Sequence, residues 1–130
     1  MATQSSLNQF FSSSSFAVVG ASNNRSKFGN RILRKYLEHQ LKVFPIHPQE
    51  EIIEGLRCLK SVEELPEETK SISIITPPPI TEKVVQEAIE KGIQNIWMQP
   101  GAESEKAMAE CKKVGINLIA DGSCLLLVLG

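Results

Sequence analysis

The chain has 130 residues, about the size of one ordinary domain, and 42% of them are hydrophobic, which is enough for one buried core. Its formal net charge of −1 argues against a protein that holds nucleic acid by bulk positive charge. A membrane-spanning helix needs roughly 18–20 apolar residues, and the longest apolar run here, residues 125–129, is only long enough for a strand.

The first fifteen residues contain no charged residue and are rich in Ser, Thr, Gln and Asn. They lack the basic start and apolar stretch of a secretory signal and the arginines of a mitochondrial presequence. The three cysteines, at positions 58, 111 and 124, form no C-x-x-C pair and no disulfide framework. We therefore expect a cytoplasmic protein with a flexible or helical lead over residues 1–15 and one domain over residues 16–130.

Short apolar runs alternate with amphipathic segments along residues 16–120. The runs predict buried strands that begin near residues 16, 42, 71, 95 and 117. Helices are predicted over residues 28–39, 80–91 and 103–114, the second with Ile80 facing inward. Residues 49–70 are mixed, with an extended piece at 52–53, a turn at Gly55 and a helix that begins at Ser61.

This alternation predicts an α/β fold, because successive parallel strands need crossovers that place helices over the sheet. We expect a doubly wound, Rossmann-like domain with a mainly parallel sheet of about five strands and helices on both faces. Ligands of such sheets bind at the carboxyl ends of the strands. The informative loops are therefore those that follow the predicted strands, at residues 20–27, 47–48, 76–79, 99–101 and 121–124.

The first of these loops has the features of a phosphate site. Gly20, Ala21 and Ser22 lie between a strand and a helix, where backbone N–H groups and a helix N-terminus favour an anion, and Arg25 and Lys27 follow. The motif is weak, because the next glycine after Gly20 is Gly29 and G-x-G-x-x-G is absent.

Positive charge is also unevenly distributed along the chain. Residues 1–48 carry six Lys and Arg residues and one Glu, whereas residues 49–130 carry eight basic and fourteen acidic residues. The basic segment is either a solvated helix face or the place where an anionic ligand docks.

The second loop bears on the choice of nucleotide. An NAD site usually has Asp or Glu at the end of the second strand to bind the ribose hydroxyls. Here that position holds Ile46, His47 and Pro48, with no acid before Glu50. A phosphorylated ribose is tolerated there, which favours coenzyme A or NADP over NAD.

Five motifs occur in order over residues 16 to about 124: Phe-Ala-Val-Val-Gly-Ala-Ser, Pro-Ile-His-Pro, Ile-Ile-Thr-Pro-Pro-Pro, Ile-Trp-Met-Gln-Pro-Gly-Ala and Asp-Gly-Ser-Cys. Together they resemble the stand-alone CoA-binding domain proteins, which are similar to the CoA-binding Rossmann domain of succinyl-CoA synthetase and of ADP-forming acyl-CoA synthetases. The chain departs from the family pattern at Gln49, where Lys is frequent, so one phosphate contact is expected to be missing. It departs again at Gly122 and Ser123, which separate Asp121 from Cys124.

The resemblance implies coenzyme A, or an acyl-CoA, as the ligand and assigns a part of it to each loop. Gly20, Ala21 and Ser22 would meet the pyrophosphate, helped by Arg25 or Lys27. The adenosine would be flanked by Ile46, His47 and Pro48, and the opposite wall of the cleft would be formed by Thr76, Pro77 and Pro78. The pantetheine would pass along Gln99, Pro100 and Gly101.

The residues themselves favour binding over catalysis. The two histidines have no metal-ligand spacing, no metal site is expected, and no Gly-x-Ser-x-Gly elbow occurs. Cys124 is the candidate redox thiol, either able to form a mixed disulfide with coenzyme A or simply a buried small side chain. Trp97 is expected in the core rather than stacked on a base.

Two functions remain open at this point. The first is a CoA-binding module without catalytic machinery of its own, acting as carrier, sensor or docking partner. The alternative is a small NAD(P)-binding oxidoreductase or redox sensor, whose substrate domain would have to come from a partner chain. A homodimer or an unidentified protein partner would meet that need, and the apolar residues 125–129 would form its interface or pack in the core.

Overall fold

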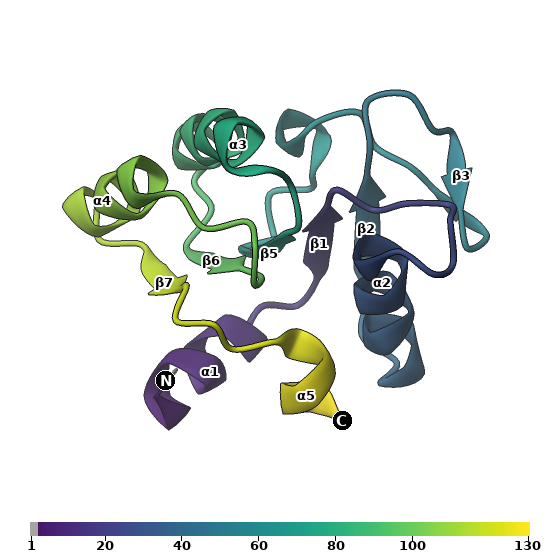
Figure 1. Cartoon of the computed structure of the whole chain (residues 1–130), viewed down its shortest axis with the longest axis horizontal. Coiled ribbons are helices and arrows are strands. Elements are labelled where there is room, and N and C mark those ends of the chain that lie inside the picture. The colour runs from purple at the N-terminus through teal and green to yellow at the C-terminus, as the bar shows by residue number, and fades with distance from the viewer. Residues whose placement is uncertain (1–2) are drawn as a thin grey trace.

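Five parallel strands form the central sheet in the computed structural model, which describes residues 3–130. The strand order is β2-β1-β5-β6-β7, so the sheet extends in both directions from β1 (Figure 1). The strands are β1 (Phe16–Val19), β2 (Val43–Ile46), β5 (Ser71–Ile74), β6 (Asn95–Met98) and β7 (Asn117–Ile119). This arrangement confirms the predicted Rossmann-like α/β fold.

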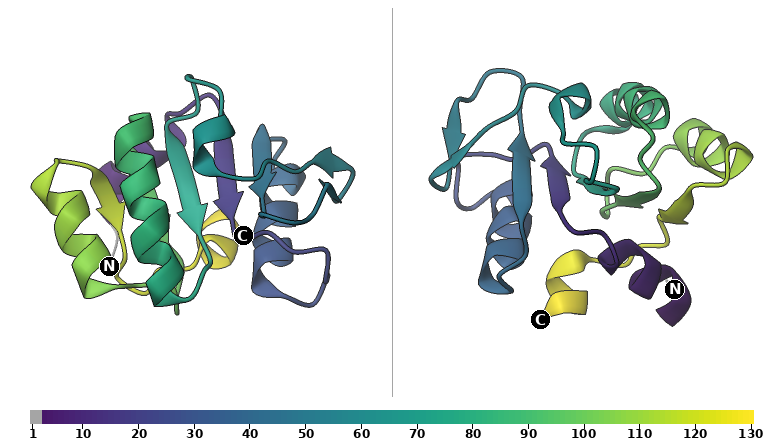
Figure 2. Two further views of the ribbon diagram at one scale, coloured as in Figure 1. Left: turned by 90° about the horizontal axis from the view of Figure 1, so that it is seen from above. Right: turned by 180° about the vertical axis from the view of Figure 1, so that it is seen from behind.

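Helices cover both faces of the sheet (Figures 1 and 2). One face is packed by α1, α2 and α5, and the other by α3, α4 and a single 3₁₀ turn, η1. Their bounds are α1 (Gln4–Phe11), α2 (Phe28–Glu38), η1 (Val62–Glu64), α3 (Pro78–Lys91), α4 (Glu105–Lys113) and α5 (Leu125–Leu129). The predicted doubly wound arrangement is therefore confirmed.

The side chains of β1 alternate between two hydrophobic cores. Phe16 and Val18 pack under α1 and α2, whereas Ala17 and Val19 pack under α3. All four are at most 5% exposed. Burial on both faces is the physical reason that this strand is a continuous apolar run rather than an alternating one.

Helix α1 belongs to the first of these cores. The Thr3 hydroxyl accepts a hydrogen bond from the Ser6 N–H at 3.0 Å and so caps the helix. At its other end Phe10 is fully buried, with its ring edge-on to Trp97 at a centroid distance of 5.3 Å. Trp97 is itself fully buried, which confirms the prediction that it is a core residue.

The apolar run at residues 125–129, expected in an interface or in the core, is a helix in which Leu125 is buried but Leu127 is 84% exposed. Two local predictions were wrong. Ile80, expected to face inward, is 44% exposed, because it lines an open cavity, described below, instead of packing in the core. The helix expected after Ser61 is only one 3₁₀ turn, because Pro66 disfavours helical backbone at Leu65.

Candidate functional site

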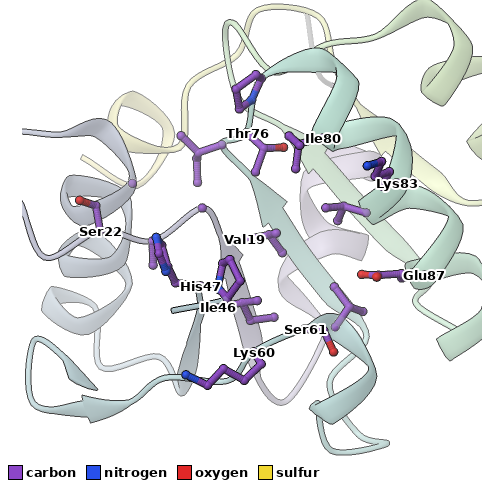
Figure 3. A pocket seen from close by; sticks show the side chains of 18 of the residues that line it. Val19, Ser22, Ile46, His47, Lys60, Ser61, Thr76, Ile80, Lys83 and Glu87 are labelled. Carbon is purple, nitrogen blue, oxygen red and sulfur yellow. The ribbon is translucent and has the colours of Figure 1, made fainter. Parts of the chain in front are cut away.

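A cavity of about 600 Å³ opens at the carboxyl ends of β1, β2 and β5 (Figure 3). Val19, Ile46 and Ile75 form part of its wall, each at or just beyond the end of a different strand. β1 lies between the other two strands, so this is the point at which the strand order reverses. Ligands of open parallel sheets bind at such a switch point, and the volume is that of an ordinary small-molecule site.

Most of the predicted ligand-binding residues lie together around this cavity. Those that line it are Gly20, Ala21, Ser22, Lys27, Ile46, His47, Pro48, Thr76 and Pro77. Outside the lining lie Arg25, Pro78, Gln99, Pro100, Gly101 and Cys124. The structure thus brings the loops after β1, β2 and β5 to one place and keeps the loop after β6 apart from it.

Several lining residues were missed by sequence reasoning. They come from the start of α2, from the segment around η1 and from residues 80–87 of α3. These residues are Phe28, Gly29, Lys60, Ser61, Val62, Ile80, Lys83, Val84 and Glu87. Only Gly29 carried a local signal, as a glycine at a helix start. The others lie outside the loops that directly follow the predicted strands, so the rule that points to those loops does not reach them.

The loop after β1 passes very close to the end of β5 at Gly20. This residue has φ = +98°, a backbone conformation that favours glycine. A Cβ atom there would lie 2.8 Å from the carbonyl oxygen of Ile75. The bare backbone at Gly20 therefore forms part of the cavity wall, and α2 starts directly behind it.

Asn30, which is fully buried in α2, holds this loop in place. Its side-chain amide donates to the carbonyl oxygen of Ser22 at 2.8 Å and to the carboxylate of Glu54 at 3.0 Å. Its side-chain oxygen accepts from Nε of Arg34 at 2.7 Å. A buried amide that satisfies three partners fixes the loop backbone before any ligand arrives.

Glu54 reaches Asn30 from a two-stranded hairpin, β3 (Ile52–Ile53) and β4 (Leu56–Arg57). Its turn residues, Glu54 and Gly55, have φ values of +50° and +77°, the pattern of a tight type I′ turn. The extended piece at 52–53 and the turn at Gly55 were both predicted.

The same carboxylate of Glu54 lies 3.3 Å from Nε of Arg25. Arg25 was expected to help bind a phosphate. In the structure its guanidinium pairs with Glu54 and lies outside the cavity lining, while Lys27 lies within it.

The backbone that follows β2 fixes the ring of His47. Nδ1 of His47 accepts hydrogen bonds from the N–H groups of Gln49 at 3.0 Å and Glu50 at 3.1 Å. In the neutral ring the proton therefore lies on Nε2, which is left as a donor. This arrangement suits a side chain that flanks a ligand.

The charges around the cavity are mainly positive. Lys27, Lys60 and Lys83 line it from three different segments of the chain. Figure 3 shows Lys60 and Lys83. Glu87 lines it as well, and its pKa is raised by burial and by the nearby carboxylates of Glu63 and Glu90. A cavity with this charge favours an anionic ligand.

The loop after β6 supports α5 instead of the cavity. Gln99 is fully buried, and its side-chain oxygen accepts a hydrogen bond from the N–H of Leu125 at 3.0 Å. Its Nε2 has no hydrogen-bond partner within residues 3–130. Cys124, the residue before α5, is partly buried.

Comparison with known proteins identifies the family of this chain. The sequence model of the CoA binding domain matches residues 14–129, nearly the whole chain. The chain belongs to the CoA-binding domain family. This match favours coenzyme A over the NAD(P) alternative, which gains no support from the relatives below.

Proteins of two sizes share this CoA-binding domain. The alpha subunit of the ADP-forming acetate–CoA ligase II of Pyrococcus furiosus is 31% identical over 124 residues, which cover 87% of this chain and 27% of that protein. This chain therefore spans about a quarter of the length of that curated relative. A conserved hypothetical protein from the same organism superimposes with a TM-score of 0.84 at 39% identity, over 88% of this chain and 97% of that one.

A dinucleotide-forming acetyl-coenzyme A synthetase of Ca. Korarchaeum cryptofilum, solved with phosphate and ADP, gives a TM-score of 0.74 at 27% identity. The match covers 84% of this chain and 26% of that one. The domain thus occurs both as a short chain and within larger synthetases.

Residues 3–130 contain no group of three or more His, Cys, Asp or Glu side chains placed to hold a metal ion. None of their helices is long and apolar enough to cross a membrane.

Proposed function

We propose that this protein binds coenzyme A or an acyl-CoA in the cavity at the ends of β1, β2 and β5, as a binding module without catalytic machinery of its own. The observation that carries the proposal is the bare glycine backbone at Gly20, held against the start of α2 at the switch point of the sheet. In a chain of this family, such a cradle suits a pyrophosphate.

Each part of coenzyme A can be assigned to a different loop around the cavity. The pyrophosphate would lie on Gly20–Ser22, with the ammonium group of Lys27 nearby. The adenosine would lie between His47–Pro48 and Thr76–Pro77, which face the same cavity from two strand ends. The pantetheine would then leave the cavity past β5 toward Gln99–Gly101, which brings its thiol to the side of the sheet where Cys124 lies.

The end of β2 favours coenzyme A over NAD. Ile46, His47 and Pro48 line the cavity there, and none of them is acidic. The nearest acid in sequence, Glu50, accepts a hydrogen bond from the side chain of Asn23. A carboxylate positioned to bind ribose hydroxyls is what an NAD site would need at this place.

The role proposed for this binding module is that of a carrier, a sensor or a docking partner. The curated relatives join the domain to other segments, because the match covers only 27% of the Pyrococcus ligase subunit. If this protein takes part in a ligase reaction, the catalytic groups would therefore come from another chain or domain.

Titration calorimetry under reductant tests the proposal, with coenzyme A, NADH and NADPH as ligands. We expect saturable binding of coenzyme A and its loss in Ser22→Trp, where the indole fills the cradle. Ser5→Trp is the matched control, because Ser5 is exposed on α1. Binding of NADH or NADPH alone, or equal binding by the two tryptophan variants, would contradict the proposal.

A further inference from the structure

Lys60 is carried to the cavity by a short extension of the sheet next to β2. The N–H of Leu59 donates to the carbonyl oxygen of Pro45 at 2.9 Å, and the N–H of His47 donates to the carbonyl oxygen of Leu59 at 2.9 Å. Ile46 and Leu59 form a parallel bridge. Lys60 thus follows an added strand segment and reaches the same edge as His47.

The ammonium group of Lys60 is held near the end of β2. Its Nζ lies 3.4 Å from the carbonyl oxygen of Glu50, and its backbone N–H donates to the carboxylate of Glu64 at 3.1 Å. Figure 3 shows the side chain at the rim of the cavity, close to Ile46 and His47. The carbonyl contact leaves two of the three ammonium protons for a ligand.

The three cavity lysines differ in the part of a nucleotide that they can reach. Lys27 follows the glycine loop, where the pyrophosphate belongs. Lys83 lies on α3, across the cavity from the loop after β2. Lys60 lies next to the end of β2, which is where the ribose of a bound nucleotide sits in this fold.

We propose that Lys60 binds the 3′-phosphate of coenzyme A and makes the site selective for the phosphorylated ribose. The sequence suggested a missing phosphate contact at Gln49, an exposed residue whose N–H is used by His47. Lys60 supplies that positive charge from a different segment. This inference rests on the proposed function, because it assumes that the ligand is coenzyme A.

The test compares coenzyme A with dephospho-CoA, which lacks only the 3′-phosphate, in the full chain by calorimetry at low salt. We expect the natural sequence to bind coenzyme A about tenfold more tightly, equal to about 1.4 kcal/mol. Lys60→Gln should reduce this ratio to about one by weakening coenzyme A, with dephospho-CoA changed less than twofold. Lys60→Arg should keep the ratio.

Two further lysine variants locate the effect. Lys27→Gln should weaken both ligands together and keep their ratio, because it lies at the pyrophosphate. Lys83→Gln should also keep the ratio, because it lies on the opposite wall. Retained dephospho-CoA binding shows that a variant is folded.

The outcomes separate this inference from the proposed function. If the natural sequence binds neither ligand, the proposed function fails. If it binds both equally, or if Lys60→Gln keeps the tenfold preference, coenzyme A remains the ligand and the role of Lys60 is refuted. Loss of the preference in Lys83→Gln instead would move the phosphate to α3.

Discussion

A Cβ atom on Gly29 would lie 2.1 Å from the carbonyl oxygen of Gly20. The first turn of α2 therefore rests directly on the loop that forms the proposed phosphate cradle. The sequence lacks G-x-G-x-x-G, yet Gly29 performs the task of close packing between the helix and the strand that this fingerprint assigns to its third glycine. The shape of the cradle depends on both residues.

Gly29→Ala should disrupt this contact. Because the neighbouring atom is backbone, the helix and the loop must move apart, and we expect a loss of about 1–3 kcal/mol in the free energy of unfolding. The affinity for coenzyme A should fall at least about tenfold. Urea denaturation and calorimetry measure the two effects.

Gly92→Ala is the control for this variant. Gly92 has φ = +88° but no heavy atom within 4 Å of a Cβ, so alanine there costs only backbone strain of about 1 kcal/mol. Binding should be unchanged. An unchanged affinity in Gly29→Ala would show that the cradle tolerates the displacement.

Asn30→Ala should loosen the same loop by another route. The variant leaves the Ser22 carbonyl oxygen and Nε of Arg34 without their buried partner, which costs about 1–3 kcal/mol of stability. Arg25→Ala should change stability by less than about 0.5 kcal/mol, because the Arg25 side chain is 65% exposed. Equal effects of the two variants in urea denaturation would contradict the anchoring role of Asn30.

The three thiols should differ in their reaction with N-ethylmaleimide. Cys58 and Cys111 are buried, whereas Cys124 is partly exposed. Burial also raises the pKa of Cys58, and it raises that of Cys111 to about 11, which lowers their thiolate fractions at neutral pH. We expect mass spectrometry of the native protein to find Cys124 modified first.

The same reaction tests the path of the pantetheine. If the thiol end of coenzyme A lies beside Cys124, saturating ligand should slow its modification, while the slow rates at Cys58 and Cys111 stay the same. No protection of Cys124 would place the pantetheine elsewhere and would remove the case for a mixed disulfide. The Cys124→Ser variant shows which modified peptide belongs to Cys124, because that peptide should no longer react with N-ethylmaleimide.

Stability should fall at alkaline pH. The pKa of Cys111 is raised from 9.0 to about 11 in the folded protein, so the folded state holds this proton more tightly than the unfolded state does. Its contribution is complete below about pH 9 and is lost as the pH rises toward 11, by at most about 2–3 kcal/mol. Urea denaturation between pH 7 and 10.5 should show a shallower decline in Cys111→Ser.

Local patterns were sufficient for most of the elements. The run Phe16–Val19 is apolar because both of its faces are buried, and such burial leaves a mark in the sequence that needs no tertiary contact to read. Gly92 ends α3 in the left-handed conformation, as its position after the helix predicts. The run at residues 125–129 could be a strand or a helix, because five apolar residues have too little periodicity to decide.

The class of fold and the positions of Gly20, His47 and Thr76 at strand ends could be read from local patterns, because each strand and its loop are contiguous in the chain. Which loops share a cavity could be learned only from the folded protein. That choice depends on the strand order, which puts β2 and β5 beside β1 and moves Gln99 away to support Leu125. Lys60 reaches the cavity because a backbone bridge joins Ile46 to Leu59. This contact links residues thirteen positions apart, and no local sequence pattern encodes it.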